Sequence, residues 1–260
     1  MINKKYILFV IVALSFSFSI KKEKKFIPPG TAQITETFFA DETEVSNFSW
    51  LEYEFWTISK YGKGSKEHLA MLPDTLVWRQ KISDNEPYVK YYYRHVAYKD
   101  HPVLGVSYEQ VIEFCKWRTD RVKTFYSIKN KKEINIEYRL PTKAEWELLS
   151  SVPPFYLNSA LNKKGEVAFN HRWMSDSISR KYYEEHKSYP DVTAKVYSFE
   201  KNLFGLFNIY GNVAEMVSEK GVSKGGSWRN LSEECHAGKE ITYTGPTAWL
   251  GFRCVCVITK

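Results

Sequence analysis

The sequence predicts a single α+β domain in which short helices and strands are joined by a large share of irregular chain. Two motifs that start helices lie in the middle of the chain, and glycines divide the part after residue 170 into short runs. Hydrophobic residues make up 43% of the 260 residues and aromatic residues 16%, which is typical of a folded chain rather than a disordered one. A chain of this length can bury one sizeable core.

Residues 1–20 have a basic start followed by an apolar stretch that is shorter than the ~20 residues needed to cross a bilayer. The small residues Ser17 and Ser19 near its end complete the pattern of a secretory signal peptide. Four lysines within 21–25 oppose translocation, so a short uncleaved anchor is the alternative. We therefore expect residues 21–260 to form one exported domain.

Helix starts are predicted at three places along the chain. A capped helix is expected from about residues 46–47. A second begins at Ser107, where Gln110 completes a capping box, and a third begins at Thr142, where Glu145 does the same. Beyond residue 170, frequent Gly, Asn, Asp and Ser residues indicate turns between short strands.

Residues 61–101 are rich in Tyr, Lys and Asp, and we expect them to form irregular insertion loops that wrap the core. Tyr and Trp bury much area at little entropic cost, which is why they concentrate in binding hot spots. The insertion is therefore predicted to carry an interaction surface, with packing onto the core of the domain as the alternative. The candidate residues are Trp78, Tyr88, Tyr91, Tyr92 and Tyr93.

Residue patterns alone point to no particular reaction. The sequence has no phosphate-binding glycine loop, no serine-hydrolase elbow and no zinc-protease motif, and its six histidines show no metal-ligand spacing. The formal net charge of +7 is modest and comes without base-reading motifs, so we expect no nucleic-acid partner. The four cysteines fit an oxidising compartment but show no CxxC spacing.

Six segments together resemble one family, the formylglycine-generating enzymes or sulfatase-modifying factors. They occur in the order of the family, over roughly residues 26–258. The matching segments are EVSN from Glu44, PVLGVSY with CKW from Pro102 and Cys115, RLPTKAEWE from Arg139, NLFGLFNIYGNVAE from Asn202, GGSW from Gly225 and GFRC from Gly251. The resemblance implies an irregular fold of that type, related to C-type lectins, with little regular secondary structure.

The oxidase members of this family bind copper(I) through two cysteines that follow the GGS turn. Copper(I) is a soft ion that prefers thiolate ligands, so the loss of one thiolate removes half of its coordination. The resemblance places the first ligand position on Asn230 and the second on Cys235. We therefore expect no copper and no oxidase activity; a copper oxidase of atypical coordination through Cys235 is the alternative.

The resemblance also implies a disulfide between Cys115 and Cys254. The second disulfide of secreted members falls on Ser150 and Glu240, so both of its cysteines are missing. A calcium site is implied in the GN loop, with hard oxygen ligands that suit this ion. Its expected ligands are Asn208, Gly211, Val213 and Glu215.

Residues 72–102 are similar to the gliding-motility and type IX secretion members of this family from Bacteroidota, the GldK/GldJ type. This resemblance implies an exported, non-catalytic protein in the periplasm or on the periplasmic face of the outer membrane. We expect it to act with protein partners in an envelope complex, and to meet the membrane only through those partners or its N-terminal segment. A ligand- or glycan-binding module on the same fold is a further alternative.

Overall fold

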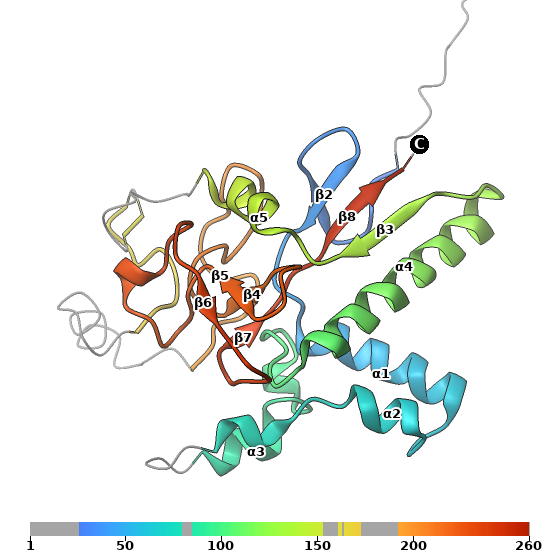
Figure 1. Cartoon of the computed structure of the whole chain (residues 1–260), viewed down its shortest axis with the longest axis horizontal. Coiled ribbons are helices and arrows are strands. Elements are labelled where there is room, and N and C mark those ends of the chain that lie inside the picture. Colours follow the sequence, from blue (N-terminus) through green and yellow to red (C-terminus); the bar gives the residue numbers. More distant parts are fainter. Residues whose placement is uncertain (1–25, 80–84, 153–160, 163, 173–191, 260) are drawn as a thin grey trace, which may run out of the picture.

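The computed structural model in Figure 1 describes residues 26–79, 85–152, 161–162, 164–172 and 192–259. These residues form two small sheets with a group of helices beside them, as the α+β prediction requires. The predicted signal peptide or anchor, residues 1–20, lies outside the described residues. Within the described ranges, no helix has the length and apolar content needed to cross a bilayer.

The first sheet joins both ends of the domain. Its four strands lie in the order β1-β2-β8-β3, and every neighbouring pair is antiparallel. The last strand therefore lies in the middle, with its Cys256 opposite Phe39 on one side and Tyr138 on the other. The strand bounds are β1 Thr31–Gln33, β2 Phe38–Asp41, β3 Ile136–Arg139 and β8 Val255–Ile258.

The second sheet is built from strands of two or three residues, in the order β6-β5-β4-β7. Strand β4 pairs in parallel with β7, while the other neighbours are antiparallel. Strands this short agree with the glycine-divided pattern of the sequence. Their bounds are β4 Ala214–Met216, β5 Val222–Lys224, β6 Ile241–Thr242 and β7 Leu250–Gly251.

The three predicted helix starts are confirmed. Helix α1 (Asn47–Tyr61) is capped by Ser46, whose hydroxyl accepts a hydrogen bond from the backbone amide of Ser49. Helices α4 (Tyr108–Asn130) and α5 (Lys143–Ser150) both begin with the capping boxes expected at their N-termini. Each box satisfies two backbone donors that the helix itself leaves free.

The insertion is more regular than predicted. It contains α2 (Lys66–Met71), α3 (Glu86–Tyr91) and the 3-10 turns η1 (Thr75–Trp78) and η2 (Val96–Tyr98). A further 3-10 turn, η4 (Ser232–Glu234), lies in the C-terminal part. The insertion turns start at side-chain caps, and buried aromatic side chains then hold these short elements in place.

Strand β8 separates two parts of the core, because successive side chains of a strand point to opposite faces. Cys254 and Cys256 point into the cluster that contains Cys115 and the aromatic side chains of α1 and α4. Val255, between them, points into the cluster formed by α5 and the 204–210 loop, which also contains Cys235.

Candidate functional site

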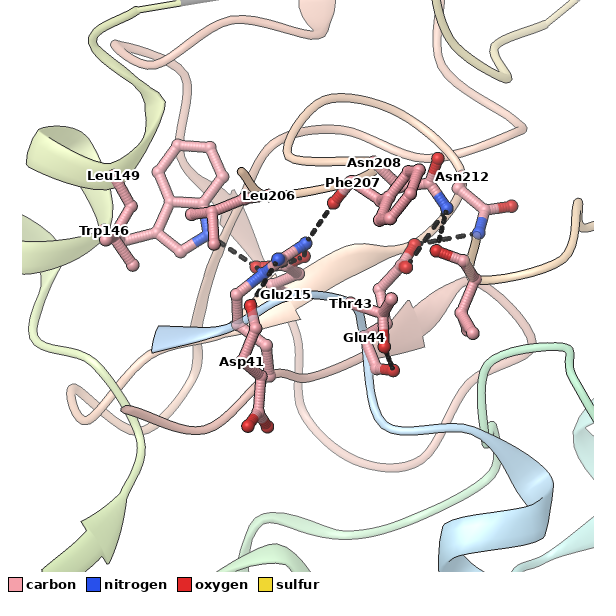
Figure 2. A network of polar contacts seen from close by, with 12 residues as sticks. Asp41, Thr43, Glu44, Trp146, Leu149, Leu206, Phe207, Asn208, Asn212 and Glu215 are labelled. Carbon is pink, nitrogen blue, oxygen red and sulfur yellow. Dashed lines mark hydrogen bonds and ion pairs between the residues drawn. The ribbon is translucent and has the colours of Figure 1, made fainter. Parts of the chain in front are cut away.

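A buried ion pair joins the segments that carry the family resemblance and lies between the two sheets. The guanidinium of Arg253 donates to both carboxylate oxygens of Glu215 on β4, with Nη2 only 2.5 Å from Oε1. The indole Nε1 of Trp146 donates to the same carboxylate at 2.7 Å (Figure 2). Arg253 also donates to the carbonyl oxygens of Asp41 and Phe207. Both members of the pair are buried, so these contacts stand in place of the water that the charges lose.

A second buried carboxylate, Glu44, lies directly before α1 and faces the 208–212 loop (Figure 2). Its two oxygens accept from the side-chain amides of Asn212 at 2.8 Å and Asn208 at 3.1 Å. Burial raises the pKa of Glu44 from its usual 4.5 to about 8, Arg253 lowers it, and the Glu215 carboxylate raises it further. Glu44 is therefore held largely in its protonated form at neutral pH.

The 208–212 loop depends on residues with left-handed backbone conformations. Asn208, Gly211 and Asn212 have φ values of 48°, 70° and 56°. A Cβ atom at Gly211 would lie 2.2 Å from the carbonyl oxygen of Asn170, so only glycine fits there. The two asparagines accept this conformation more readily than most residues and also supply the amides that bind Glu44.

The predicted calcium ligands fit the loop only in part. Both oxygens of Glu215 are already engaged by Arg253 and Trp146, so this carboxylate is not available to a cation in this arrangement. The Oδ1 atom of Asn208 is buried and has no partner among the described residues, which fits a ligand role. No group of three or more His, Cys, Asp or Glu side chains suited to a metal occurs in the described part of the chain. Calcium at this loop stays a prediction resting on Asn208, and a chelator-dependent melting temperature is its test.

The first copper-binding thiol is expected at residue 230. The structure has Asn230 there, and its side chain closes a turn by hydrogen bonds. The Oδ1 atom of Asn230 accepts from the backbone amide of Ser227 at 3.0 Å and from its hydroxyl at 2.7 Å. The Nδ2 atom of Asn230 faces the Glu234 carboxylate at 3.4 Å. This amide side chain closes the turn after the two glycines and brings no sulfur to the site.

Cys235 is buried and packs closely against the glycine turn. A Cβ atom at Gly226 would lie 2.4 Å from its sulfur. Burial raises the pKa of Cys235 to about 12, and the Glu234 carboxylate acts in the same direction. Cys256 points into the other core cluster, across β8, so the fold does not bring this second thiol to Cys235. The thiol of Cys235 is therefore protonated at neutral pH and poorly reactive.

The thiols of Cys115 on α4 and Cys254 before β8 lie side by side. Their sulfur atoms are 3.6 Å apart, and both residues are buried. Burial raises the pKa of Cys254 well above its usual value, and the neighbouring Cys115 adds to this shift. The fold thus places the two residues of the predicted disulfide together, and the bond itself stays a prediction.

The five aromatic residues of the insertion do not share one environment. Trp78, Tyr92 and Tyr93 are buried within the chain, and Tyr88 is half-buried and stacked on Trp78. Only Tyr91 is exposed, at 42%. Most of this aromatic surface packs onto the domain itself, so an interaction role is left chiefly to Tyr91.

Three of the central polar residues were not identified from the sequence as site residues, whereas Glu215 and Asn208 were predicted as calcium ligands. Glu44, Trp146 and Arg253 each lie inside a segment that carries the family resemblance, which was the available signal. Their roles depend on contacts between distant segments: Arg253 and Trp146 lie 38 and 69 residues from Glu215, and Glu44 lies 164 and 168 residues from Asn208 and Asn212. No local pattern in the sequence specifies such contacts.

The raised pKa of Glu44 predicts that stability falls as pH rises from about 4.5 to about 8. The folded state holds a proton that the unfolded state releases, so this contribution is full below about pH 4.5 and is lost as pH rises towards about 8. In the variant Glu44→Gln, the free energy of unfolding should fall by about 4 kcal/mol less between pH 5 and 8.5 than in the wild type. Urea unfolding of both proteins across this range measures the difference, and parallel profiles would contradict the assignment.

The disulfide between Cys115 and Cys254 would close a loop across a separation of 139 residues. In the chain-entropy model such a bond stabilises by about 4–5 kcal/mol, so reduction should lower the melting temperature. Peptide mapping of protein from the exported fraction should identify this cystine and leave Cys235 and Cys256 as thiols. A Cys256→Ser variant, as the control, should keep the bond. Four free thiols in that fraction would refute the pairing.

Comparison with known proteins places these features in one family. The family profile described as "Sulfatase-modifying factor enzyme 1-like domain" matches residues 9–258. The formylglycine-generating enzymes of Bos taurus and Mus musculus are each 28% identical over 187 residues, covering 60% of this chain and 44% of the relative. The chain thus spans less than half the length of these relatives.

The solved structure of CarF matches at 18% identity with a TM-score of 0.54, covering 85% of this chain and 87% of that one, which is a likeness of fold. The chain belongs to the family of sulfatase-modifying factor enzyme 1-like domains.

Proposed function

We propose that this protein is a non-catalytic member of its family that serves as a structural and interaction component of an envelope complex. The observation that carries the proposal is Asn230, which stands where the resemblance places the first copper-binding cysteine. The turn that would present a thiol is instead closed by the Asn230 side chain.

A single thiol offers copper(I) only half of the two-thiolate coordination that suits this ion. At Cys235 even that thiol is buried, and burial raises its pKa to about 12, so metal binding would have to displace a tightly held proton. The amide of Asn230 is a hard ligand and is already hydrogen-bonded. These properties favour a protein that keeps the fold without the oxidation chemistry.

The proposed location is the periplasm or the periplasmic face of the outer membrane. The basic and apolar start of the sequence and the adjacent thiols of Cys115 and Cys254 support export to an oxidising compartment. The similarity of the insertion to the GldK/GldJ type supports a place among gliding-motility or type IX secretion components. A copper oxidase of atypical coordination is the second candidate, favoured by the retention of Cys235.

Copper(I) titration and a peptide assay together test the proposal. The reduced protein should bind no copper(I) tightly and should form no aldehyde from a Cys-x-Pro-x-Arg peptide under oxygen. The matched variant Asn230→Cys restores a second thiol in the same turn and should gain copper(I) affinity by about 100-fold or more, equivalent to about 3 kcal/mol. Aldehyde formation by the wild type, lost in Cys235→Ser, would overturn the non-catalytic function.

A further inference from the structure

The C-terminal end of α4 carries two apolar side chains that are open to solvent. Phe125 is 58% exposed and Ile128 is 76% exposed, and their spacing of three places them on one face of the helix. Helix α1 packs along the preceding turns of α4, where Arg121 lies over the ring of Trp56. The described residues leave Phe125 and Ile128 largely uncovered, so this pair forms an apolar tip at the end of the helix.

Lysines surround the apolar tip. Within residues 121–135 they are Lys123, Lys129, Lys131 and Lys132. The last three are exposed, and the ammonium of Lys129 lies 5.6 Å from the centre of the Phe125 ring. Lys131 caps the end of α4 in a left-handed backbone conformation, with φ 53°. Basic side chains therefore accompany the tip both within the helix and just past its end.

The carboxylates of the neighbouring elements do not balance these lysines. Glu133 is the one acidic residue within residues 121–135, and the carboxylate of Asp120 lies farther back on α4, where it attracts Lys60 of α1. Glu137 on β3 lies between two residues that are buried in the core cluster with α4, so its side chain points to the opposite face of the sheet. Glu36 lies in the turn between β1 and β2, two strands away from β3. Positive charge is thus in excess beside the tip.

The chain enters the described domain beside the same end of α4. Phe26 packs edge-on against Tyr126 with ring centroids 4.8 Å apart, and the carbonyl oxygen of Pro29 accepts from Arg118 at 3.1 Å. From Pro29 back to Phe26, the chain therefore runs along α4 towards its C-terminal end. Residues 21–25 come directly before Phe26 and contain four lysines and one glutamate. A second basic segment is thus joined to the domain next to the apolar tip.

We propose that this end of the domain binds directly to the surface of an anionic phospholipid bilayer. The apolar tip enters the boundary between the headgroups and the acyl chains. The exposed side chains of Lys129, Lys131 and Lys132 face the lipid phosphates. Apolar side chains flanked by lysines are the combination that holds amphipathic helices at such surfaces. This contact adds the folded domain itself to the two routes to the membrane expected from the sequence, which are protein partners and the N-terminal segment.

A bilayer fits these features better than other partners do. Nucleic acid would bind the lysines but would leave Phe125 and Ile128 in water. An acidic protein could satisfy both features, but the position of the tip favours lipid. The largely apolar residues 6–20 predict a signal peptide or a short anchor, and only the basic residues 21–25 separate them from Phe26. Both kinds of segment meet a bilayer, so the tip lies beside the part of the chain that does so.

A fluorescent probe on the tip tests the proposal in the full chain. In Ile128→Cys labelled with the environment-sensitive dye NBD, emission should rise and shift to the blue with vesicles that contain phosphatidylglycerol, and should not change with phosphatidylcholine alone. The four native cysteines are buried, so the new thiol should react selectively. Val96→Cys, at a residue 70% exposed, carries the control probe and should respond to neither vesicle. Val96 follows α3, which lies far from the end of α4 (Figure 1).

Substitutions around the probe separate this contact from attachment by the N-terminal segment alone. Lys129→Gln with Lys132→Gln should raise the phosphatidylglycerol concentration for half of the change by about 10-fold or more, because each lysine near an anionic surface strengthens binding. Phe125→Ser should also raise it, since less apolar surface then enters the bilayer. Lys90→Gln with Lys99→Gln, at two exposed lysines of the insertion, is the matched control and should leave it unchanged. Circular dichroism should show the same fold for all of these proteins.

Three results would overturn the proposal. The first is a tip probe that does not respond to anionic vesicles. The second is a response that is equal for neutral and anionic vesicles, or equal at the tip and at Val96. The third is a response to polyglutamate or to duplex DNA without one to vesicles, which would assign the tip to an acidic protein or to nucleic acid. None of these measurements depends on copper binding, so a failure here is distinct from a failure of the proposed function.

Discussion

The buried ion pair between Arg253 and Glu215 is the constraint on which the arrangement of this domain depends. Neither residue is exposed to water, and an isolated buried charge is costly, so each must keep its partners. Those partners come from β2, α5 and the loop before β4, which lie far apart in the sequence. Satisfying the two charges of this pair therefore fixes how the two sheets and α5 meet.

This constraint is separate from the position at which the oxidases of the family bind copper. The glycine turn after β5 is closed locally, by Asn230 and Ser227, and does not contribute to the central ion pair. The loss of a thiol in that turn leaves the core contacts unchanged. A chain of this family can thus keep its fold without a thiol at that position.

The sequence predicted those features that local chemistry determines. Both capping boxes and the glycine-rich turns follow from hydrogen bonds within a few residues, and the structure has them where expected. The short helices of the insertion were missed, and the burial of Trp78 and Tyr92 was expected only as the alternative, because it depends on packing against the distant Leu104 and Val213. Contacts of Glu44 with the 208–212 loop likewise span the chain, so no local pattern reveals them.

The most direct test of this account is a double-mutant cycle on the central ion pair, measured by urea unfolding. Glu215→Gln keeps an acceptor for Trp146 but removes the carboxylate that is hydrogen-bonded to Arg253, so it should destabilise the fold by about 3–5 kcal/mol. Arg253→Met should destabilise it similarly, and the double variant should lose at least about 2 kcal/mol less than the sum of the two. Additive losses, or a loss below about 1 kcal/mol for either single variant, would contradict the central role of this pair.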